Sequence, residues 1–289
     1  MVKVRLNKYL KFSIKVVVSA AALIYVFSRI NFNEILNVYR NIHFIWLFIA
    51  LVVFILSKII SAFRLNLFFK EIELILKHSY NLKLYLLGMF YNLFLPGGIG
   101  GDGYKIYLLN KNHEIKTGKI IWAILNDRLT GLVSIICLLA LLSYGVVFQS
   151  EFSVRSFAWL LIPVSLLSYY IFITFFFKVY RRIFIKVNVM ALIIQMLQIV
   201  CAGFIFYSLG YRDQLASYIF LFLISSIIAA LPVTVGGMGS RELTFMIGAE
   251  MMGLNVEISV AMSLMFYIIT AFTSMFGIWY NLYPQKMNR

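Results

Sequence analysis

The chain consists of long apolar segments separated by short stretches that carry most of its charge. A transmembrane helix needs about 20 consecutive, mainly apolar residues. Six segments meet this requirement: residues 12–30, 44–63, 118–147, 156–177, 188–209 and 258–283. The pattern therefore predicts an all-α polytopic membrane protein with six transmembrane helices. The first segment follows a basic stretch, as in a signal peptide, but is interpreted as a retained helix.

Two further apolar segments, residues 84–110 and 215–252, are interrupted by one repeated motif. The first copy reads LPGGIGGDGYK over residues 95–105, and the second reads LPVTVGGMGSR over residues 231–241. Proline and clustered glycines break helices, and irregular backbone at membrane depth is tolerated only inside protein or beside a cavity. Each broken segment is therefore predicted to be a re-entrant hairpin whose two arms enter and leave on one side.

Lys and Arg are distributed unevenly over this arrangement. With the N-terminus in the cytoplasm, 19 of them fall in cytoplasmic segments and four in outer loops. Because basic loops stay inside, we expect a plasma-membrane protein with both termini in the cytoplasm. The two Gly-rich hairpins then enter from opposite sides. This predicts an inverted-topology repeat in one domain, residues 1–289, with halves at about 1–150 and 151–289. Residues 64–80 are predicted to form an interfacial amphipathic helix.

Composition supports this class of protein. The 289 residues are 62% hydrophobic and 13% charged, with a mean hydropathy of +0.91. A net charge of +15 can indicate nucleic-acid binding, but cytoplasmic basic loops account for it, so no nucleic-acid partner is expected. Cys137 and Cys201 lie within apolar segments. Neither a disulfide framework, a metal site nor a cofactor is predicted.

Ionisable residues within a bilayer are costly and usually functional. Six stand out at the motif turns and in the segment 118–147: Asp102, Lys105, Asp127, Arg128, Arg241 and Glu242. Because the hairpin tips and the middle of that segment should reach similar depths, these three cations and three carboxylates are expected to share one cavity. Lys58 is placed near the inner end of its span and is expected to extend towards the interface.

A phosphate group fits this set of residues. Glycine lets backbone approach a ligand, and the half-helix after each turn would direct N–H groups inward. The glycines concerned are Gly100, Gly101, Gly236 and Gly237. Arg128 and Arg241 suit bidentate phosphate binding, with Lys105 as a point charge, while the carboxylates could hold the cations, meet a ligand amine or take up protons. Alternatively, the six charges only pair with one another, and Asp102 caps the helix beginning near Gly103.

At these motifs the chain resembles the flippase-like family named after the transmembrane region of lysylphosphatidylglycerol synthases. Members carry a segment like N-x3-P-G-x2-G-G-D at residues 92–102, a span with D-R-L at 127–129, and a segment like P-x3-G-G-x-G-x2-E at 232–242. The resemblance covers nearly the whole chain and implies movement of an anionic or aminoacylated lipid between leaflets. Lys105 stands where the family pattern is expected to have arginine. The soluble aminoacyl-transferase domain of full-length synthases is not expected here, because the sequence ends just after its last span.

The expected function is therefore transport rather than catalysis, and no catalytic residue is predicted. The substrate would be a phospholipid or lipid-linked glycan whose headgroup crosses the cytoplasmic membrane, and a lipid or polysaccharide synthase is a possible partner. Two alternatives stay open. One is a membrane-embedded transferase acting on a lipid-linked sugar, with Asp102 or Asp127 as base. The other is a non-transporting partner subunit of a lipid synthase.

Overall fold

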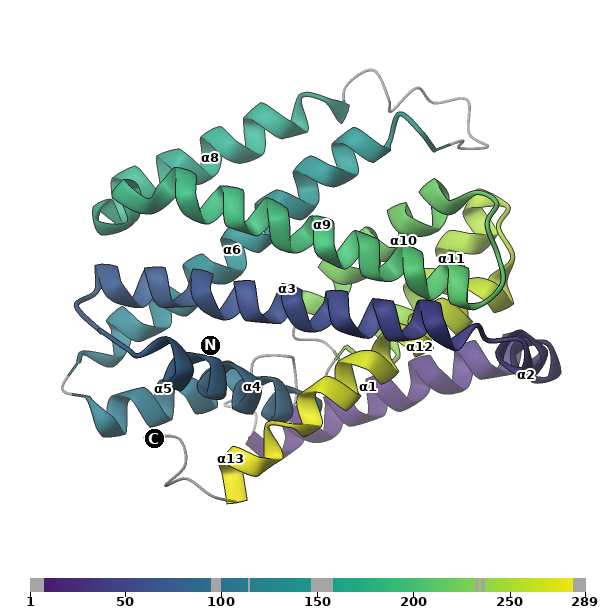
Figure 1. The fold of residues 1–289 in the computed structure, drawn as a ribbon, viewed down its shortest axis with the longest axis horizontal. Coiled ribbons are helices and arrows are strands. Elements are labelled where there is room, and N and C mark those ends of the chain that lie inside the picture. The colour runs from purple at the N-terminus through teal and green to yellow at the C-terminus, as the bar shows by residue number, and fades with distance from the viewer. Residues whose placement is uncertain are drawn as a thin grey trace, which may run out of the picture.

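The computed structural model describes residues 8–94, 100–113, 115–146, 158–231, 234 and 237–282, and every element in these ranges is a helix (Figure 1). The helices of the first half are α1 (Lys8–Arg29), α2 (Phe32–Arg40), α3 (Phe44–Glu71), α4 (His78–Phe94), α5 (Gly100–Asn112) and α6 (Thr117–Leu142). Those of the second half are α8 (Leu161–Phe176), the 3-10 helix η1 (Lys178–Ile183), α9 (Phe184–Ser208), α10 (Leu215–Ala230), α11 (Ser240–Met252), α12 (Val256–Met275) and α13 (Ile278–Leu282).

Within the described ranges, four helical segments are long and apolar enough to cross a membrane: Phe44–Glu71, Thr117–Leu142, Lys178–Ser208 and Val256–Leu282. They confirm four of the six predicted spans. The predicted first span corresponds to α1, which meets the length test only together with α2, across a bend of 86°. The predicted fourth span corresponds to α8, which has 16 residues in the described part of the chain. The described helices thus support four spans, or five if the bent pair counts as one.

One predicted element is wrong. The interfacial amphipathic helix at 64–80 does not form, because α3 runs on without a break to Glu71. Its final two turns are buried, with Leu65, Phe68 and Phe69 almost completely covered. The chain reverses at Glu73, whose φ of 66° is left-handed, before α4 begins. The first charged residue after an apolar segment was therefore a poor guide to where the helix ends.

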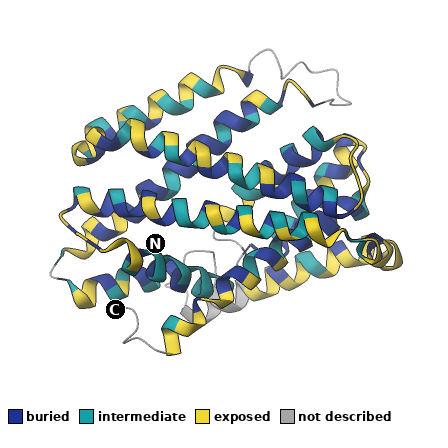
Figure 2. Cartoon of the chain, viewed as in Figure 1, coloured by how far each residue is buried: buried dark blue, intermediate teal, exposed yellow. Residues whose placement is uncertain are grey.

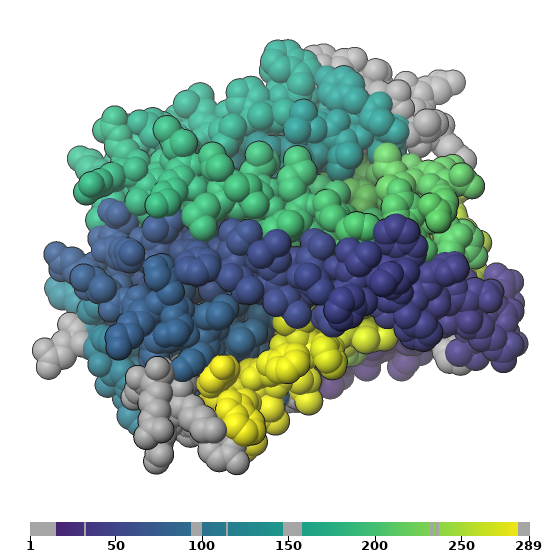
Figure 3. Space-filling model, in the orientation of Figure 1, coloured from purple at the N-terminus to yellow at the C-terminus, as the bar shows by residue number. Residues whose placement is uncertain are grey.

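The long helices α3 and α9 pack side by side and run antiparallel (Figures 1 and 3). At one end, the His43 N–H donates to the Ser208 carbonyl at 2.9 Å. At the other end, the rings of Phe68 and Tyr180 meet edge to face at 5.4 Å. These two contacts fix which ends of the two helices lie together.

The broken segment 84–110 is a helical hairpin formed by α4 and α5. Its arms touch where the backbones of Gly88 and Gly101 meet. They begin and end together as well, because Asn112 Nδ2 donates to the Tyr80 hydroxyl at 3.5 Å. This hairpin starts from the end of the α3–α9 pair where α3 finishes.

The segment 215–252 forms a second hairpin, from α10 and α11, whose arms touch where Gly248 faces Leu221. It starts from the opposite end of the α3–α9 pair, where α9 finishes. Its exit returns to that end, since Asn255 and Glu257 line one cavity, of about 230 Å³, with Leu209 and Tyr211. The two hairpins therefore approach the interior from opposite ends (Figure 1).

Burial follows the arrangement expected of a protein surrounded by lipid (Figure 2). The inward faces of α6, α9 and α12 are buried, whereas large apolar side chains are exposed on the outward faces. Phe44, Phe175 and Ile185 each expose about three quarters of their surface. An exposed apolar surface of this extent needs an apolar solvent, which agrees with a multi-pass membrane protein.

Candidate functional site

Asp102, Lys105 and Arg128 form a charged cluster between α5 and α6. Both oxygens of the Asp102 carboxylate are used: one accepts from Lys105 Nζ at 3.0 Å, and the other accepts from Arg128 Nε. Asp102 and Lys105 are buried, whereas 34% of the Arg128 side chain is exposed. Because two cations share one carboxylate, the cluster has a net positive charge, and Arg128 presents part of it at the accessible edge.

The preceding residue on α6, Asp127, has a different partner. Arg64 Nε donates to Asp127 Oδ1 at 2.7 Å, and a terminal nitrogen of the same guanidinium donates to the Asp127 carbonyl at 3.0 Å. Both side chains are nearly buried. Consecutive residues of an α-helix point about 100° apart, so α6 directs Asp127 towards α3 and Arg128 towards α5. The Arg64–Asp127 pair is neutral and joins α3 to α6.

Tyr85 of α4 lies between the Asp102 cluster and the Arg64–Asp127 pair. Lys105 Nζ is 4.6 Å from the centre of the Tyr85 ring, a cation–π contact. The Tyr85 hydroxyl lies near Ser61 and Arg64 of α3 and near Asp127 of α6. The first hairpin thus places Lys105 beside residues of the central helix α3.

Glu242, in the second motif, closes a turn. Its Oε2 accepts from the Gly239 N–H at 2.7 Å, and its Oε1 accepts from Ser263 Oγ of α12 at 3.0 Å. Gly239 has a φ of 85°, and a Cβ there would lie 2.8 Å from the Ser19 carbonyl of α1. Glu242 is almost fully buried. One oxygen therefore closes the turn at the start of α11, and the other ties that start to α12.

The neighbouring residue Arg241 takes no part in this turn and contacts aromatic rings instead. Its guanidinium carbon lies 4.7 Å from the centre of the Phe266 ring and 5.8 Å from that of Phe222. One terminal nitrogen, Nη1, is buried and has no hydrogen-bond partner. The alternative in which all six charges only pair with one another therefore does not hold for Arg241, which contacts aromatic rings instead.

Lys58 does not lie near the end of its helix, where it was expected. It lies halfway along α3, which runs from Phe44 to Glu71, and its Nζ is 4.5 Å from the centre of the Phe54 ring. It is within electrostatic range of Arg64 and Arg241. The predicted span, 44–63, ended eight residues before α3 does, so a lysine in the middle of the helix was placed near its end.

The first-motif glycines have explanations other than ligand binding. Gly100 is the first residue of α5. The Gly101 N–H donates to Asn92 Oδ1 at 2.8 Å, so this donor is not directed at a ligand. A Cβ on Gly101 would lie 1.8 Å from the Gly88 carbonyl oxygen, so the close approach of α4 requires glycine here.

The second-motif glycines are only partly described. Gly237 has a φ of 80°, and a Cβ there would lie 3.1 Å from the Ala229 Cβ, so it serves the turn into α11. Gly236 lies outside the described residues, as do Pro96 and Pro232.

The structure thus assembles three of the six expected site residues, Asp102, Lys105 and Arg128, through direct contacts. Asp127, Arg241 and Glu242 have other partners, and two of the nearby groups, Arg64 and Lys58, were missed. The sequence did contain a signal for both: the helical spacing of apolar residues continues over 44–71, which gives no reason to end the helix at Arg64.

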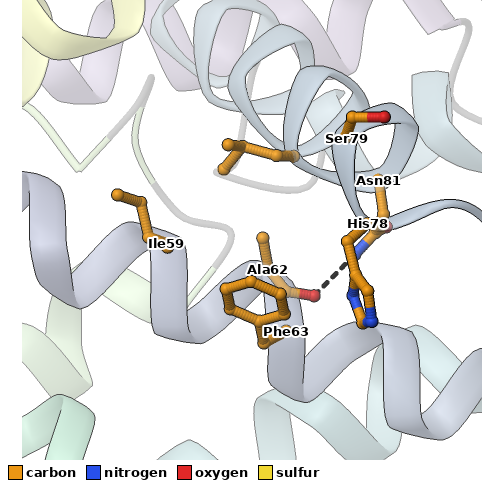
Figure 4. A pocket seen from close by; sticks show the side chains of 7 residues that line it. Ile59, Ala62, Phe63, His78, Ser79 and Asn81 are labelled. Atoms are coloured by element: carbon orange, nitrogen blue, oxygen red, sulfur yellow. Dashed lines mark hydrogen bonds between the residues drawn. The ribbon is translucent and has the colours of Figure 1, made fainter.

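A crevice between the second half of α3 and the start of α4 is a separate feature (Figure 4). It has a volume of about 110 Å³ and is lined by Ile59, Ala62, Phe63, His78, Ser79, Asn81 and Leu82. Asn81 Nδ2 donates to the Ala62 carbonyl across it, at 2.5 Å. None of the six expected charged residues lines this largely apolar crevice.

The fold and the charges held among its helices define a multi-pass helical membrane protein with an ionisable interior. The family model described as "Lysylphosphatidylglycerol synthase TM region" matches residues 12–191 and 180–277. The chain therefore belongs to this family, which confirms the resemblance of its motifs and relates it to membrane lipid metabolism or translocation. No curated protein and no solved structure matched the chain.

Proposed function

We propose that this protein moves an anionic lipid headgroup between the leaflets of the plasma membrane. The observation that supports this most is the charge imbalance among the groups of the interior. Five cations, Lys58, Arg64, Lys105, Arg128 and Arg241, lie among three carboxylates, Asp102, Asp127 and Glu242; the carboxylates, Arg64 and Lys105 are buried, and the other three cations are partly exposed. An uncompensated positive charge at membrane depth is costly, and a phosphate group would offset it.

The Asp102 cluster is the proposed entry site for the headgroup. Arg128 retains an accessible surface while its Nε is fixed by Asp102, so the guanidinium is oriented before a phosphate arrives. Lys105 adds a second charge held in place by Asp102 and Tyr85. The acyl chains would stay in the surrounding lipid, in contact with the exposed apolar surface.

The two hairpins are proposed to be re-entrant and related by an inverted repeat, with halves at about residues 1–150 and 151–289. Their approach from opposite ends of an antiparallel α3–α9 pair supports this arrangement. So does the charge at the two ends. Lys70, Lys77, Lys111, Lys116, Lys119, Lys178, Arg181 and Arg182 lie at the end where α3 finishes, and Arg29, Arg40 and Arg212 lie at the other. The basic end is proposed to be cytoplasmic.

Cysteine accessibility tests this topology. Lys111 and Met251 are exposed residues at the exits of the two hairpins and suit replacement by cysteine in a chain whose buried Cys137 and Cys201 are changed to serine. In intact cells, a membrane-impermeant maleimide is expected to label Met251→Cys. It should label Lys111→Cys only after the membrane is permeabilised. Labelling of both positions from one side would contradict the inverted repeat.

Reconstitution tests the activity itself. The purified chain in liposomes is expected to accelerate the exchange of a fluorescent phosphatidylglycerol analogue between leaflets, relative to protein-free liposomes. A phosphatidylcholine analogue, whose headgroup carries no net charge, should exchange more slowly because the site attracts anions. Exchange at the protein-free rate for both lipids would reject the proposal. Turnover of a lipid-linked sugar donor by the same preparation would instead support a transferase.

A further inference from the structure

Lys58 and Arg241 meet the same group of aromatic rings in the interior. Lys58 Nζ lies 4.5 Å from the Phe54 ring centre, and the Arg241 guanidinium lies 4.7 Å from that of Phe266. Phe54 and Phe266 are in edge-to-face contact, with ring centres 5.6 Å apart. Phe222 completes the group, 4.8 Å from Phe266. One aromatic cluster, Phe54, Phe222 and Phe266, therefore carries a cation from α3 and a cation from α11.

Neither cation has an acidic partner in an ion pair within the described ranges. The ion pairs there join Arg64 to Asp127 and join Lys105 and Arg128 to Asp102. Glu242, which is next to Arg241 in sequence, attracts it electrostatically but uses its oxygens for hydrogen bonds to Gly239 and Ser263 and makes no ion pair with it. Arg241 Nη1 is buried without a hydrogen-bond partner, and Lys58 and Arg241 act on each other as like charges. Both side chains are partly exposed, and cation–π contacts offset only part of the cost of removing the rest of their surface from water.

Such a pair is unfavourable unless an anion joins it. We propose that Lys58 and Arg241 form a second anion-binding site, at the start of α11, which takes the phosphate group of the transported lipid. This inference rests on the proposed function, because it gives the headgroup a second position beside the second hairpin. Arg241 offers a planar fork with an unused donor, and Lys58 offers a point charge. The three rings are buried, so they give both cations a local environment of low polarity in which contacts with an anion are stronger.

The site would explain why the protein places one cation pair at each hairpin. A phosphate held by Lys105 and Arg128 at the first hairpin would reach Lys58 and Arg241 at the second. Between them lies Arg64, which is already neutralised by Asp127. The headgroup would thus move between two positive sites along α3, with no carboxylate free to repel it at Arg64.

Lipid-dependent stabilisation tests the proposal with Lys58→Met, which keeps an unbranched side chain one atom shorter and removes its charge. The melting temperature is measured in neutral detergent alone, with phosphatidylglycerol added, with phosphatidylcholine added, and with inorganic phosphate added. Phosphatidylglycerol is expected to raise the melting temperature of the wild type. In Lys58→Met its apparent affinity should fall about tenfold or more, the loss expected for one charged hydrogen bond. Without lipid, the variant should melt no lower than the wild type, because a partly buried charge without an acidic partner is gone.

Matched variants separate the possible outcomes. Arg241→Met should weaken the lipid effect in the same way, whereas Lys58→Arg should retain most of it. Lys186→Met, a change of an exposed lysine at the start of α9, should leave it unchanged. Retention of the full lipid effect in both methionine variants would overturn the proposal, as would stabilisation by inorganic phosphate but not by phosphatidylglycerol. A lipid effect that depends on Lys58, in a protein that moves no lipid, would keep this site and reject the proposed function.

Discussion

Replacing Arg128 with alanine is expected to lower phosphatidylglycerol exchange in liposomes by about 30-fold or more, equivalent to at least about 2 kcal/mol for a truncated charged contact. The change removes the accessible cation of the Asp102 cluster. It leaves Asp102 paired with Lys105 at 3.0 Å, so the cluster becomes neutral and stays satisfied. The measurement is the initial rate of lipid exchange, together with the melting temperature of each variant.

Two controls give this result its meaning. Arg128→Lys keeps the charge but loses the planar fork and should show an intermediate rate. Arg182→Ala removes an exposed arginine from η1 and should exchange lipid at the wild-type rate. A wild-type rate in Arg128→Ala would show that Arg128 only holds α5 against α6, and that headgroup binding must be assigned elsewhere.

The helical class and the location of the first cluster could be predicted from the sequence because both depend on local patterns. Long apolar segments give spans, and the repeated motif marks the two hairpins. Asp102 and Lys105 are three residues apart at the start of a helix, which brings their side chains together whatever the tertiary fold. Arg128 could be added because a charge in the middle of an apolar segment must face a polar partner.

The partners of the remaining charges depend on packing between helices that are distant in sequence. Asp127 and Arg128 are adjacent, but which of them faces α3 and which faces α5 follows from how α6 is rotated. Arg64 was assigned to the start of an interfacial helix because a charged residue usually ends an apolar segment. The neutralising contact with Asp127, 63 residues away, lets α3 continue through it.

Glycine illustrates the same limit. A glycine in a motif shows that a side chain is not tolerated, but it does not show what occupies the space. At Gly101 the neighbour is the backbone of Gly88 in the other arm of the hairpin, and at Gly239 it is the backbone of α1. Gly101 was expected to lie at a turn that meets a ligand, and Gly239 belongs to the second copy of the same motif. The structure shows that helix packing alone is sufficient to require them.

The Arg64–Asp127 pair leads to the largest expected loss of stability. Arg64→Ala would leave Asp127 as an uncompensated charge between α3 and α6, which typically costs about 3–5 kcal/mol. The measurement is unfolding in detergent by denaturant, followed by helical circular dichroism. Because α6 also carries Arg128, loosening this contact should slow lipid exchange even though Arg64 is already neutralised and is not proposed to hold the headgroup.

A double substitution decides whether the loss arises from the broken pair. Arg64→Met combined with Asp127→Leu removes both charges and fills the space with apolar atoms, so it should recover most of the stability lost in Arg64→Ala. The single variants Arg64→Met and Asp127→Leu are measured beside it. If the double variant loses as much stability as these two variants together, the pair is not coupled and the effect of Arg64 is one of packing. Recovery of stability without recovery of lipid exchange would show that the pair also sets the rotation of α6 that directs Arg128 at Asp102.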